Sequence, residues 1–408
     1  MITMATDNNN KVLNVPNLRF PEFCGEWGKD SLMNIASIFK GSGISKEQLS
    51  DSGLPCILYG ELYTKYKSEV ITDIYSKTDI ETKGLVSSKA NDVIIPCSGE
   101  AAIEIATARC VPMSNILLGG DLNIIRLNGH DGRFFAYQLN GKRKIDIAKV
   151  AQGVSVVHLY GEHLKKINVA YPSFAEQNKI AQLLSLIDKR IVSQNKIIED
   201  LKKLKVAISN RLLNNNTLLD KTASLSKFGE LKNGYAFKSS TYVPNGNYNI
   251  ITIANVCGSR EISTDCSNTI SSIPKDIQSH QILKSGDILI SLTGNVGRVS
   301  LNKGSNNLLN QRVGLFVPND SILSEFLYQT LSFVQFENSM INLAQGAAQM
   351  NIGKSDVESY LVRYSDDRGL INEISQILLN YDKKIEIENK YLQSLLSQKA
   401  FLLSNMFI

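Results

Sequence analysis

Polar and basic residues gather in short loop-like stretches near the start of each half of the chain. In the first half these are residues 40–46, which read Lys-Gly-Ser-Gly-Ile-Ser-Lys, and residues 59–66, which read Tyr-Gly-Glu-Leu-Tyr-Thr-Lys-Tyr. In the second half they are residues 233–240, 252–255, 293–298 and 310–312. Lysine, arginine, serine and amide side chains are the groups that bond to phosphates and base edges. The stretches therefore suit nucleic-acid contact, although polar loops occur in every protein.

The sequence predicts no catalytic residue and no metal site. Adenine methyltransferases need a cofactor-binding glycine-rich turn and an Asn/Asp-Pro-Pro-aromatic motif, and the chain has neither. Lys40-Gly-Ser-Gly43 is a lone Gly-x-Gly and no Gly-x4-Gly-Lys-Ser/Thr sequence occurs, so neither a dinucleotide site nor an ATP-binding loop is expected. The histidines have no metal-ligand spacing among themselves or with the cysteines. They are His130, His158, His163 and His280.

The composition is that of a globular protein with enough apolar material for two cores. The chain has 408 residues, 43% hydrophobic and 20% charged, and a formal net charge of +5. Residues 1–15 are polar and lack the apolar core of a secretory signal, and no apolar run approaches the roughly eighteen residues of a membrane span. The six cysteines form no Cys-x-x-Cys pair, which indicates reduced thiols and a cytoplasmic protein.

A long helix is predicted over residues 177–213. Steps of alternately four and three residues from Ile180 meet apolar side chains at eight of ten positions, and the stretch has no proline or glycine. This spacing predicts a helix of about 55 Å whose apolar seam needs a partner helix. Ser173 or Glu176 can cap its start. Eight Lys/Arg against three Asp/Glu make it basic, so its polar face suits phosphates, an acidic partner or solvent.

The partner helix is expected at the C-terminus of the same chain. A second seam begins at Ile374, 194 residues after the first, and again eight of its ten positions are apolar. The polar interruptions coincide, since Gln194 matches Glu388 and Lys205 matches Lys399. Two copies of one unit therefore supply the two helices.

The duplication extends beyond the helices. Residues 91–99 pair with 286–294 at an offset of 195, and blocks between 152 and 169 pair with blocks between 345 and 362 at an offset of 193. A constant order at nearly constant offset indicates a tandem pair of domain-sized repeats. Short apolar runs broken by Gly, Asn, Ser and Pro, such as residues 92–96, precede each long helix and predict strands. The expected domains are therefore β-rich, with one or two short helices in the first and a helix near 323–344 in the second. The expected fold class is α+β.

At these residues the sequence resembles the specificity subunit (HsdS) of type I restriction-modification systems. The resemblance covers residues 18–408. The second copy departs from the family pattern, because residues 364–370 lack the proline and the glutamine found before the first helix, so the second helix can begin differently. The resemblance is carried by residues 40–46, 59–66 and 234–240, and by Pro-Ser-Phe-Ala-Glu-Gln-Asn-Lys-Ile-Ala at 172–181.

The resemblance implies two target recognition domains, each reading one half of a split asymmetric DNA sequence. It implies that the long helices pack as an antiparallel coiled coil with pseudo-twofold symmetry, set the spacing of the half-sites and dock two modification subunits. Those subunits would use S-adenosylmethionine and a restriction subunit would use ATP and Mg²⁺, with none of these bound by this chain. The implied segments are a flexible lead (1–17), recognition domain 1 (18–172), a helix (173–216), a linker (217–226), recognition domain 2 (227–368) and a helix (369–408).

Individual residues follow from the same resemblance. The DNA-contact candidates are Lys40, Ser42, Lys46, Tyr59, Tyr63, Lys65 and Tyr66 in the first domain and Tyr235, Lys238, Asn255, Asn295, Arg298 and Arg312 in the second. The subunit-docking candidates are Ile180, Leu184, Ile187, Ile191, Ile198, Leu201, Ile374, Leu378, Tyr381, Ile385, Leu392 and Leu395.

Two other classes of function stay open. The chain can be a non-catalytic coiled-coil scaffold for protein partners without DNA specificity, in which case the assembled complex would show no salt-sensitive DNA binding. It can also be a self-sufficient methyltransferase or nuclease, but the missing cofactor motifs speak against that. Methylation by the isolated chain would distinguish this last class.

Overall fold

The structure is a computed structural model that describes residues 3–4, 14–345 and 350–408. Residues 1–2 and 5–13 of the predicted flexible lead, and Gly346 of the repeat, lie outside the described residues. Over the described part of the chain, no helix combines the length and the hydropathy needed to cross a membrane.

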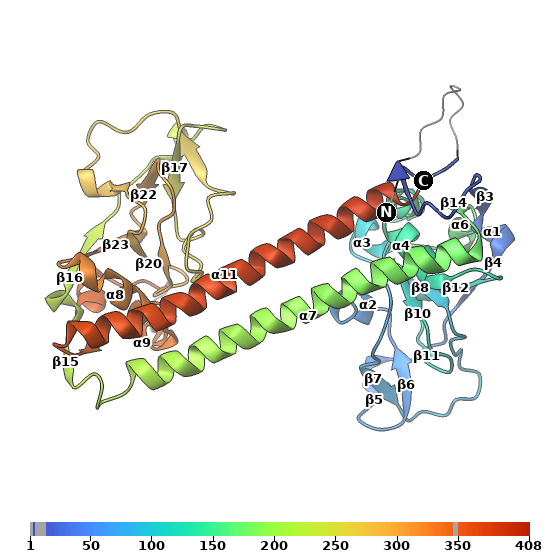
Figure 1. The fold of residues 1–408 in the computed structure, drawn as a ribbon, viewed down its shortest axis with the longest axis horizontal. Helices are drawn as coiled ribbons and strands as arrows, with labels where there is room; N and C mark the ends of the chain where they lie inside the picture. The colour runs from blue at the N-terminus through green and yellow to red at the C-terminus, as the bar shows by residue number, and fades with distance from the viewer. Residues whose placement is uncertain (1–2, 5–13, 346–349) are drawn as a thin grey trace. The chain divides into compact units, whose positions relative to one another are not determined.

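The chain divides into two compact units that share two long helices. Unit 1 comprises Met1–Asn195 and Lys390–Ile408, and unit 2 comprises Lys196–Asn389. The helices are α7 (Phe174–Leu213) and α11 (Arg368–Asn405), and each contributes one portion to each unit. Within each unit the two portions lie alongside one another and run in opposite directions (Figure 1). The predicted pair of long helices is thus confirmed.

Each long helix begins at a polar cap. The Ser173 hydroxyl accepts a hydrogen bond from the backbone N–H of Glu176 at 3.4 Å, in agreement with one of the two predicted caps. At the start of α11 the Asp367 carboxylate accepts from the N–H groups of Gly369 and Leu370, at 2.8 and 3.1 Å. Asp367 therefore replaces the proline-based start that the second copy lacks.

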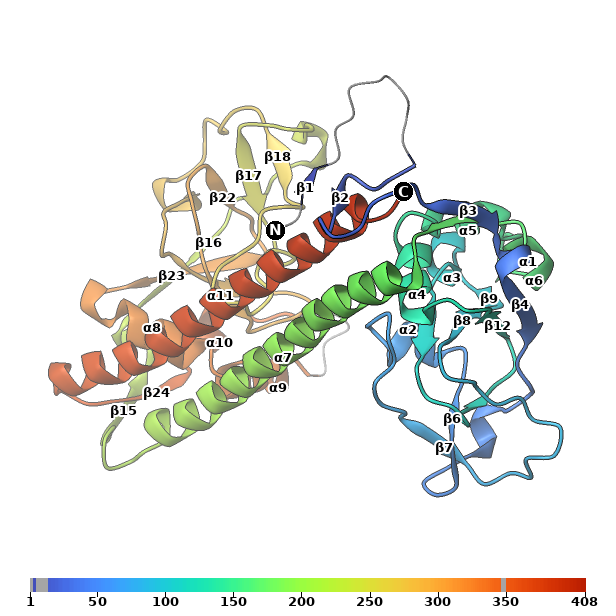
Figure 2. The ribbon, with the colours of Figure 1, turned by 45° about the vertical axis from the view of Figure 1, so that its right-hand side comes forward.

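Unit 1 contains two four-stranded sheets. The larger is antiparallel and the smaller has one parallel pair. In Figure 2 the smaller sheet lies at the end of unit 1 away from α7. The larger sheet has the order β10 (Arg109–Val111), β8 (Asp92–Pro96), β12 (Leu122–Leu127), β4 (Ala36–Lys40), and the smaller β11 (Leu117–Leu118), β6 (Leu54–Ile57), β7 (Ser76–Thr78), β5 (Leu49–Ser50). Three strand pairs and several short helices complete the described part of unit 1. The pairs are β2 (Leu18–Arg19) with β1 (Thr3–Met4), β14 (Asn168–Tyr171) with β3 (Gly28–Ser31), and β13 (Val157–His158) with β9 (Ser98–Gly99). The helices are α1 (Leu32–Ile35), α2 (Glu61–Thr64), α3 (Ala102–Ile105), α4 (Gly132–Asn140), α5 (Lys144–Val150) and α6 (Gly161–Leu164), so the prediction of one or two short helices here is wrong.

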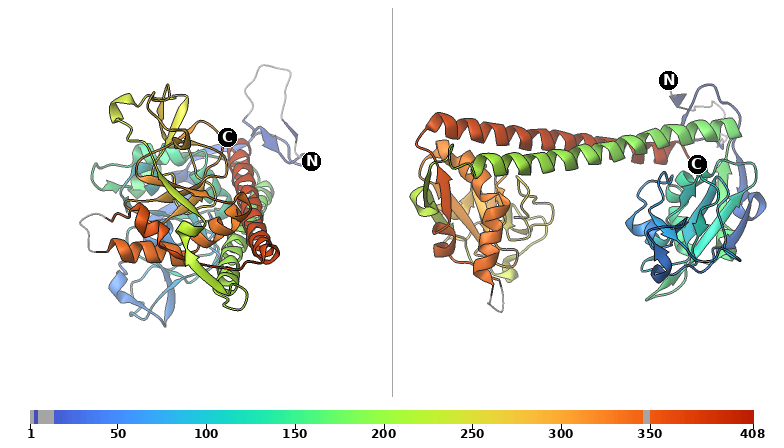
Figure 3. Two further views of the ribbon diagram at one scale, coloured as in Figure 1. Left: turned by 90° about the vertical axis from the view of Figure 1, so that its left-hand side faces the viewer. Right: turned by 90° about the horizontal axis from the view of Figure 1, so that it is seen from below.

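Unit 2 repeats this framework. Its larger sheet is again antiparallel, and its smaller sheet again contains one parallel pair. Figure 3 (right) shows its yellow to orange domain on one side of its own portions of the long helices. The larger sheet has the order β16 (Gly229–Asn233), β23 (Val313–Pro318), β20 (Ile288–Ser291), β21 (Val299–Leu301), and the smaller β18 (Asn268–Ile270), β17 (Tyr248–Ile251), β22 (Asn307–Leu309), β19 (Ile282–Leu283). The pair β15 (Lys221–Ser224) with β24 (Leu361–Tyr364) and the helices α8 (Ser324–Leu331), α9 (Val334–Ala344) and α10 (Lys354–Glu358) complete it.

The matching sheets confirm the predicted duplication and the α+β class. The strands of the larger sheets correspond one to one, read from opposite ends. The single helix predicted near 323–344 is wrong, because α8 and α9 are separate helices. Phe333 between them takes an extended backbone with φ −78° and ψ 142° and its side chain is buried. Turning this ring into the core therefore interrupts the helix.

The apolar seam is covered inside each unit, which corrects the docking prediction for its buried residues. In unit 1, Leu184 and Ile187 of α7 share one core with Met406 and Phe407 from the end of the chain. A side chain enclosed in this way offers no surface to another subunit. The buried candidates are Ile180, Leu184, Ile187, Ile198, Ile374, Leu378 and Leu395. The half-buried ones are Ile191, Leu201, Tyr381, Ile385 and Leu392.

Two neighbouring leucines of α7 test this burial. Leu184 is 0% exposed and Leu186 is 59% exposed. We expect Leu184→Ala to lower the free energy of unfolding by about 2–5 kcal/mol, since it leaves a cavity in a closed core. Leu186→Ala, the control, should change it by less than about 0.5 kcal/mol. Urea denaturation of the full chain measures both, and equal effects of the two substitutions would contradict the assigned packing.

Candidate nucleic-acid interface

A groove of about 770 Å³ in unit 1 brings three of the predicted DNA-contact residues together. They are Lys46, Tyr59 and Tyr63, which sequence reasoning drew from two separate stretches. The groove is bordered by α2, by the segment from β9 into α3, and by the start of α5. Its lining residues are Lys46, Tyr59, Gly60, Leu62, Tyr63, Thr64, Lys67, Ser98, Gly99, Glu100, Ile103, Glu104, Thr107, Arg109, Lys144 and Val156.

Tyr63 fixes the geometry of this groove. Its hydroxyl donates to the backbone oxygen of Ser98 at 2.9 Å, which ties α2 to β9. A side chain at Gly99 would place its Cβ 2.9 Å from that hydroxyl, so only glycine fits without a shift. Burial raises the pKa of Tyr63, and the phenol therefore stays protonated as a hydrogen-bond donor at neutral pH.

The groove carries charges of both signs. Lys46, Lys67 and Lys144 supply ammonium groups that can neutralise phosphates. Glu100 and Glu104 supply carboxylates, which on DNA accept a hydrogen bond from the amino group of cytosine. The combination can distinguish bases as well as hold the backbone.

The other first-domain candidates lie outside the groove, and one of them is wrong. Lys40 is exposed at the end of β4. The Ser42 hydroxyl accepts a backbone N–H of a neighbouring loop at 2.7 Å, and Lys65 forms an ion pair with Glu61 at 2.6 Å. Tyr66 is only 4% exposed and packs in a core under the smaller sheet. Its part in the DNA-contact prediction is corrected, because a buried ring cannot reach DNA.

In unit 2 backbone pairing gathers some of the candidates around the segment that joins β22 to β23. Tyr235 forms a parallel bridge with Asn310, and the carbonyl of Arg312 accepts the N–H of Leu292 at 3.0 Å. The Tyr235 hydroxyl donates to Asp276 at 2.8 Å, and this hydrogen bond raises the pKa of the phenol. The Arg312 side chain is exposed there. Lys238 is exposed three residues beyond Tyr235.

The turn at residues 293–298 presents two more candidates. Asn295 is exposed at its tip, and Arg298 forms an ion pair with Glu337 of α9 at 3.3 Å. Gly297 has φ +78° and a Cβ there would lie 2.8 Å from the Cβ of Met340. This glycine therefore lets the turn approach α9 closely.

Asn255 is structural, which corrects its assignment. It is 6% exposed, and its side-chain oxygen accepts the N–H of Thr252 at 2.8 Å. Glu61 does the same in unit 1, accepting the N–H of Leu58 at 2.9 Å. The two residues cap equivalent loops of the repeat from inside.

Sequence reasoning missed several lining residues of the first groove. Lys67 lies one residue beyond a quoted stretch, and Glu100 lies one residue beyond a repeat block, so wider windows would have included both. Lys144 and Val156 join the groove only through the tertiary fold. No local pattern marks them.

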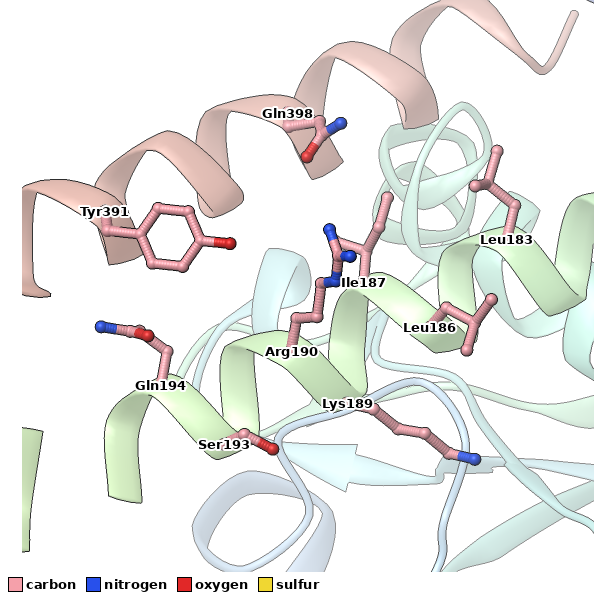
Figure 4. Close-up of a pocket in the computed structure, with 9 residues that line it drawn as sticks. All are labelled: Leu183, Leu186, Ile187, Lys189, Arg190, Ser193, Gln194, Tyr391 and Gln398. Atoms are coloured by element: carbon pink, nitrogen blue, oxygen red, sulfur yellow. The ribbon is translucent and has the colours of Figure 1, made fainter. Parts of the chain in front are cut away.

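A second groove, of about 510 Å³, lies between α7 and α11 in unit 1 (Figure 4). Its apolar lining includes Leu183, Leu186 and Tyr391, and Lys189 and Arg190 border it. Exposed apolar side chains at a helix pair mark a surface suited to a protein partner. Among the described residues, no three His, Cys, Asp or Glu side chains converge as a metal site.

Comparison with known proteins agrees with this geometry. The family described as the type I restriction modification DNA specificity domain matches residues 25–203 and again residues 221–397. The chain belongs to this family. Each match spans one domain and most of the long helix that follows it.

Three similar proteins match this chain along most of their length. The specificity subunit of the type I restriction enzyme MjaVIII of Methanocaldococcus jannaschii is 25% identical over 361 residues, which is 81% of each chain. The type I restriction-modification S subunit of M. genitalium has a TM-score of 0.63 at 17% identity, covering 97% of this chain and 99% of the other. A chain from a study of complex assembly in a type I restriction-modification system has a TM-score of 0.52 at 12% identity, covering 93% and 97%.

The lysines of the first groove give a test by salt dependence. We expect Lys46→Ala to weaken binding of the assembled complex to all DNA sequences alike and to reduce the slope of log K against log salt by about one. Fluorescence anisotropy over a series of salt concentrations measures both. Lys203→Ala, at an exposed ion pair with Glu199 on α7, is the control and should change neither. An unchanged slope for Lys46→Ala would remove this residue from the interface.

Proposed function

We propose that this chain is the sequence-specific DNA-recognition subunit of a type I restriction-modification complex. Recognition domain 1 (18–172) and recognition domain 2 (227–368) each read one half of a bipartite asymmetric target. The main support for this proposal is that the two units share a sheet framework but differ in the loops attached to it. The larger sheets of the two units have corresponding strand orders, yet the exposed polar groups on their loops differ, as expected for two readers of unequal half-sites.

The long helices set the distance between the half-sites and dock two modification subunits. Their buried seam holds the fold together, so docking uses the exposed apolar side chains of the helices instead. Several large apolar side chains of the helices are exposed, which is unfavourable in water and suits contact with a protein partner. They are Leu186, Val192, Ile197, Leu204, Val206, Ile387, Tyr391, Leu396 and Phe401.

This chain supplies recognition and leaves catalysis to its partners. Modification subunits bind S-adenosylmethionine and methylate adenine, and restriction subunits use ATP and Mg²⁺ to act on unmodified DNA. The complex works on chromosomal DNA in the cytoplasm. The support from this chain is that its sequence has no cofactor-binding motif and that its exposed groups suit binding.

Methylation mapping tests the function directly. A host expressing the modification subunit with this chain should carry N6-methyladenine at one bipartite motif, and a host expressing the modification subunit alone should not. Single-molecule sequencing of both genomes measures this. If the modification subunit is expressed and folded and no motif depends on the chain, the proposed function fails. The chain would then be a scaffold without DNA specificity.

The helices give a second test, on the spacer of that motif. Inserting one heptad after Asn195 and one after Asn389 keeps both seams in phase. The added rise of about 10.5 Å should lengthen the spacer by about three base pairs and leave both half-sites unchanged. A heptad in α7 alone is the control, and it should abolish methylation because the seams no longer align. A spacer that stays constant in the double insertion would mean that the helices do not set it.

A further inference from the structure

Unit 1 contains a largely buried ionic cluster where its recognition domain meets both long helices. The ammonium of Lys399 in α11 lies 2.7 Å from the carboxylate of Asp188 in α7. It also lies 2.5 Å from the carboxylate of Glu69, which comes from the domain between α2 and β7. The hydroxyl of Tyr137 donates to Asp188 at 2.6 Å from α4. We call Lys399, Asp188 and Glu69 joint 1.

Unit 2 has a cluster of the same kind. Lys205 of α7 lies 2.6 Å from Asp382 of α11, and the guanidinium of Arg260 lies 3.1 Å from the other carboxylate oxygen of Asp382. Gln329 of α8 donates to that oxygen at 2.7 Å, in the role of Tyr137. We call Lys205, Asp382 and Arg260 joint 2.

The helix side of the two joints is the same pair in both copies of the repeat. Asp188 and Asp382 are equivalent at an offset of 194 residues, and so are Lys205 and Lys399. In one unit α7 gives the aspartate and α11 the lysine, and in the other unit the roles of the helices are exchanged. Each unit therefore offers its domain one ammonium and one carboxylate.

On the domain side, Glu69 and Arg260 occupy equivalent positions of the repeat but carry opposite charges. The carbonyl of Glu69 accepts the N–H of Cys110 at 2.7 Å, and the carbonyl of Arg260 accepts the N–H of Leu301 at 2.7 Å. In each unit the next residue of the chain forms a parallel bridge with that same partner, Cys110 in unit 1 and Leu301 in unit 2. The positions of Glu69 and Arg260 are therefore structurally equivalent. Glu69 binds the lysine of its helix pair, whereas Arg260 binds the aspartate.

Each domain also supplies a second charged side chain, opposite in sign to its Glu69 or Arg260. Arg260 forms a two-point ion pair with Glu325 of α8, at 2.6 and 2.8 Å. In unit 1 the guanidinium of Arg109 is buried near the cluster, where burial lowers its pKa and Glu69 and Asp188 raise it. Both clusters are thus neutral, with two cations and two anions in each.

Like the Arg19–Glu176 pair at the start of α7, the joints are more enclosed than the surface ion pairs of the long helices. The side chains of joint 1 are 15%, 10% and 8% exposed for Lys399, Glu69 and Asp188, whereas those of Lys203 and Glu199 on α7 are 69% and 64% exposed. A buried ion pair is directional and costly to break, because either group alone would be left as an unpaired charge.

We propose that joint 1 and joint 2 orient their recognition domains on the long helices, and that Glu69 and Arg260 are positioning residues for one half of the DNA target each. This inference rests on the proposed function, since it concerns how accurately each domain reads its half-site. Because the two clusters share no residue, each joint acts on its own half-site alone.

Three matched glutamine substitutions test the proposal in the complex with the modification subunit. The readout is the ratio of methylation at matched sites to methylation at sites with one mismatch, taken separately for each half of the motif. We expect Glu69→Gln to lower this ratio about tenfold or more in one half only, since it leaves an extra cation in the buried cluster. Arg260→Gln should do the same in the other half only. Lys203→Gln, at the exposed pair, should leave both ratios within about twofold.

The outcomes separate the two proposals. If the wild-type chain yields no bipartite motif, the proposed function fails. If it does, and Glu69→Gln and Arg260→Gln lower both ratios equally or neither ratio, the joints are merely structural and this inference fails. Should Glu69→Gln prevent assembly, Lys399→Arg decides in its place, because it keeps the charge and changes only the geometry. It should lower the same single ratio, and an unchanged ratio would overturn the proposal.

Discussion

The enclosure of the helix seam is the constraint on which the rest of the structure depends. Two long helices with apolar residues every 3.5 positions cannot remain single in water. Each portion is covered by the other helix and by a domain, so that Leu184 lies in the core of unit 1 and Leu378 in that of unit 2. The domains are therefore parts of the helix packing rather than appendages to it. The same constraint leaves the outer helix faces free to bind other proteins.

Duplication then explains which features stay alike and which diverge. The larger sheets, the caps inside the loops and the Asp–Lys pairs are needed by both copies for packing, and they are preserved in geometry. The exposed loop residues are free of that demand. Even Glu69 and Arg260, which are opposite in charge, occupy one position, because the helix pair offers a partner of either sign. A repeat of this kind can change what its domains contact without changing how they are held.

Local patterns predicted the two long helices and a strand of the larger sheet accurately, but not the short helices. The helix expected over 177–213 runs from Phe174 to Leu213, and the strand expected from Asp92 to Pro96 has those bounds. Periodicity determines such elements, because burial on one face repeats along the chain. The same reasoning failed for the docking candidates. A seam predicts that something covers it but does not reveal whether the cover is another subunit or the chain itself.

Prediction of the site was limited by exposure and by tertiary contact. Tyr66 and Asn255 have suitable side chains, but tyrosine and asparagine also fill interior roles, and only the fold distinguishes the two. Lys46, Tyr59 and Tyr63 were candidates because they belong to stretches that the sequence marks as polar, whereas Lys144 reaches the groove from a helix with no such mark.

The mixed charge of the groove in unit 1 bears on what the domain does with DNA. A surface that only held the phosphate backbone would gain from cations alone, and carboxylates such as Glu100 and Glu104 would weaken it by repulsion. A carboxylate is favourable only where it accepts a hydrogen bond from a base amino group and so rejects bases that lack one. Under the proposed function, these carboxylates would reduce affinity in exchange for discrimination. That balance suits a subunit whose partners can add binding energy of their own but depend on it for the choice of sequence.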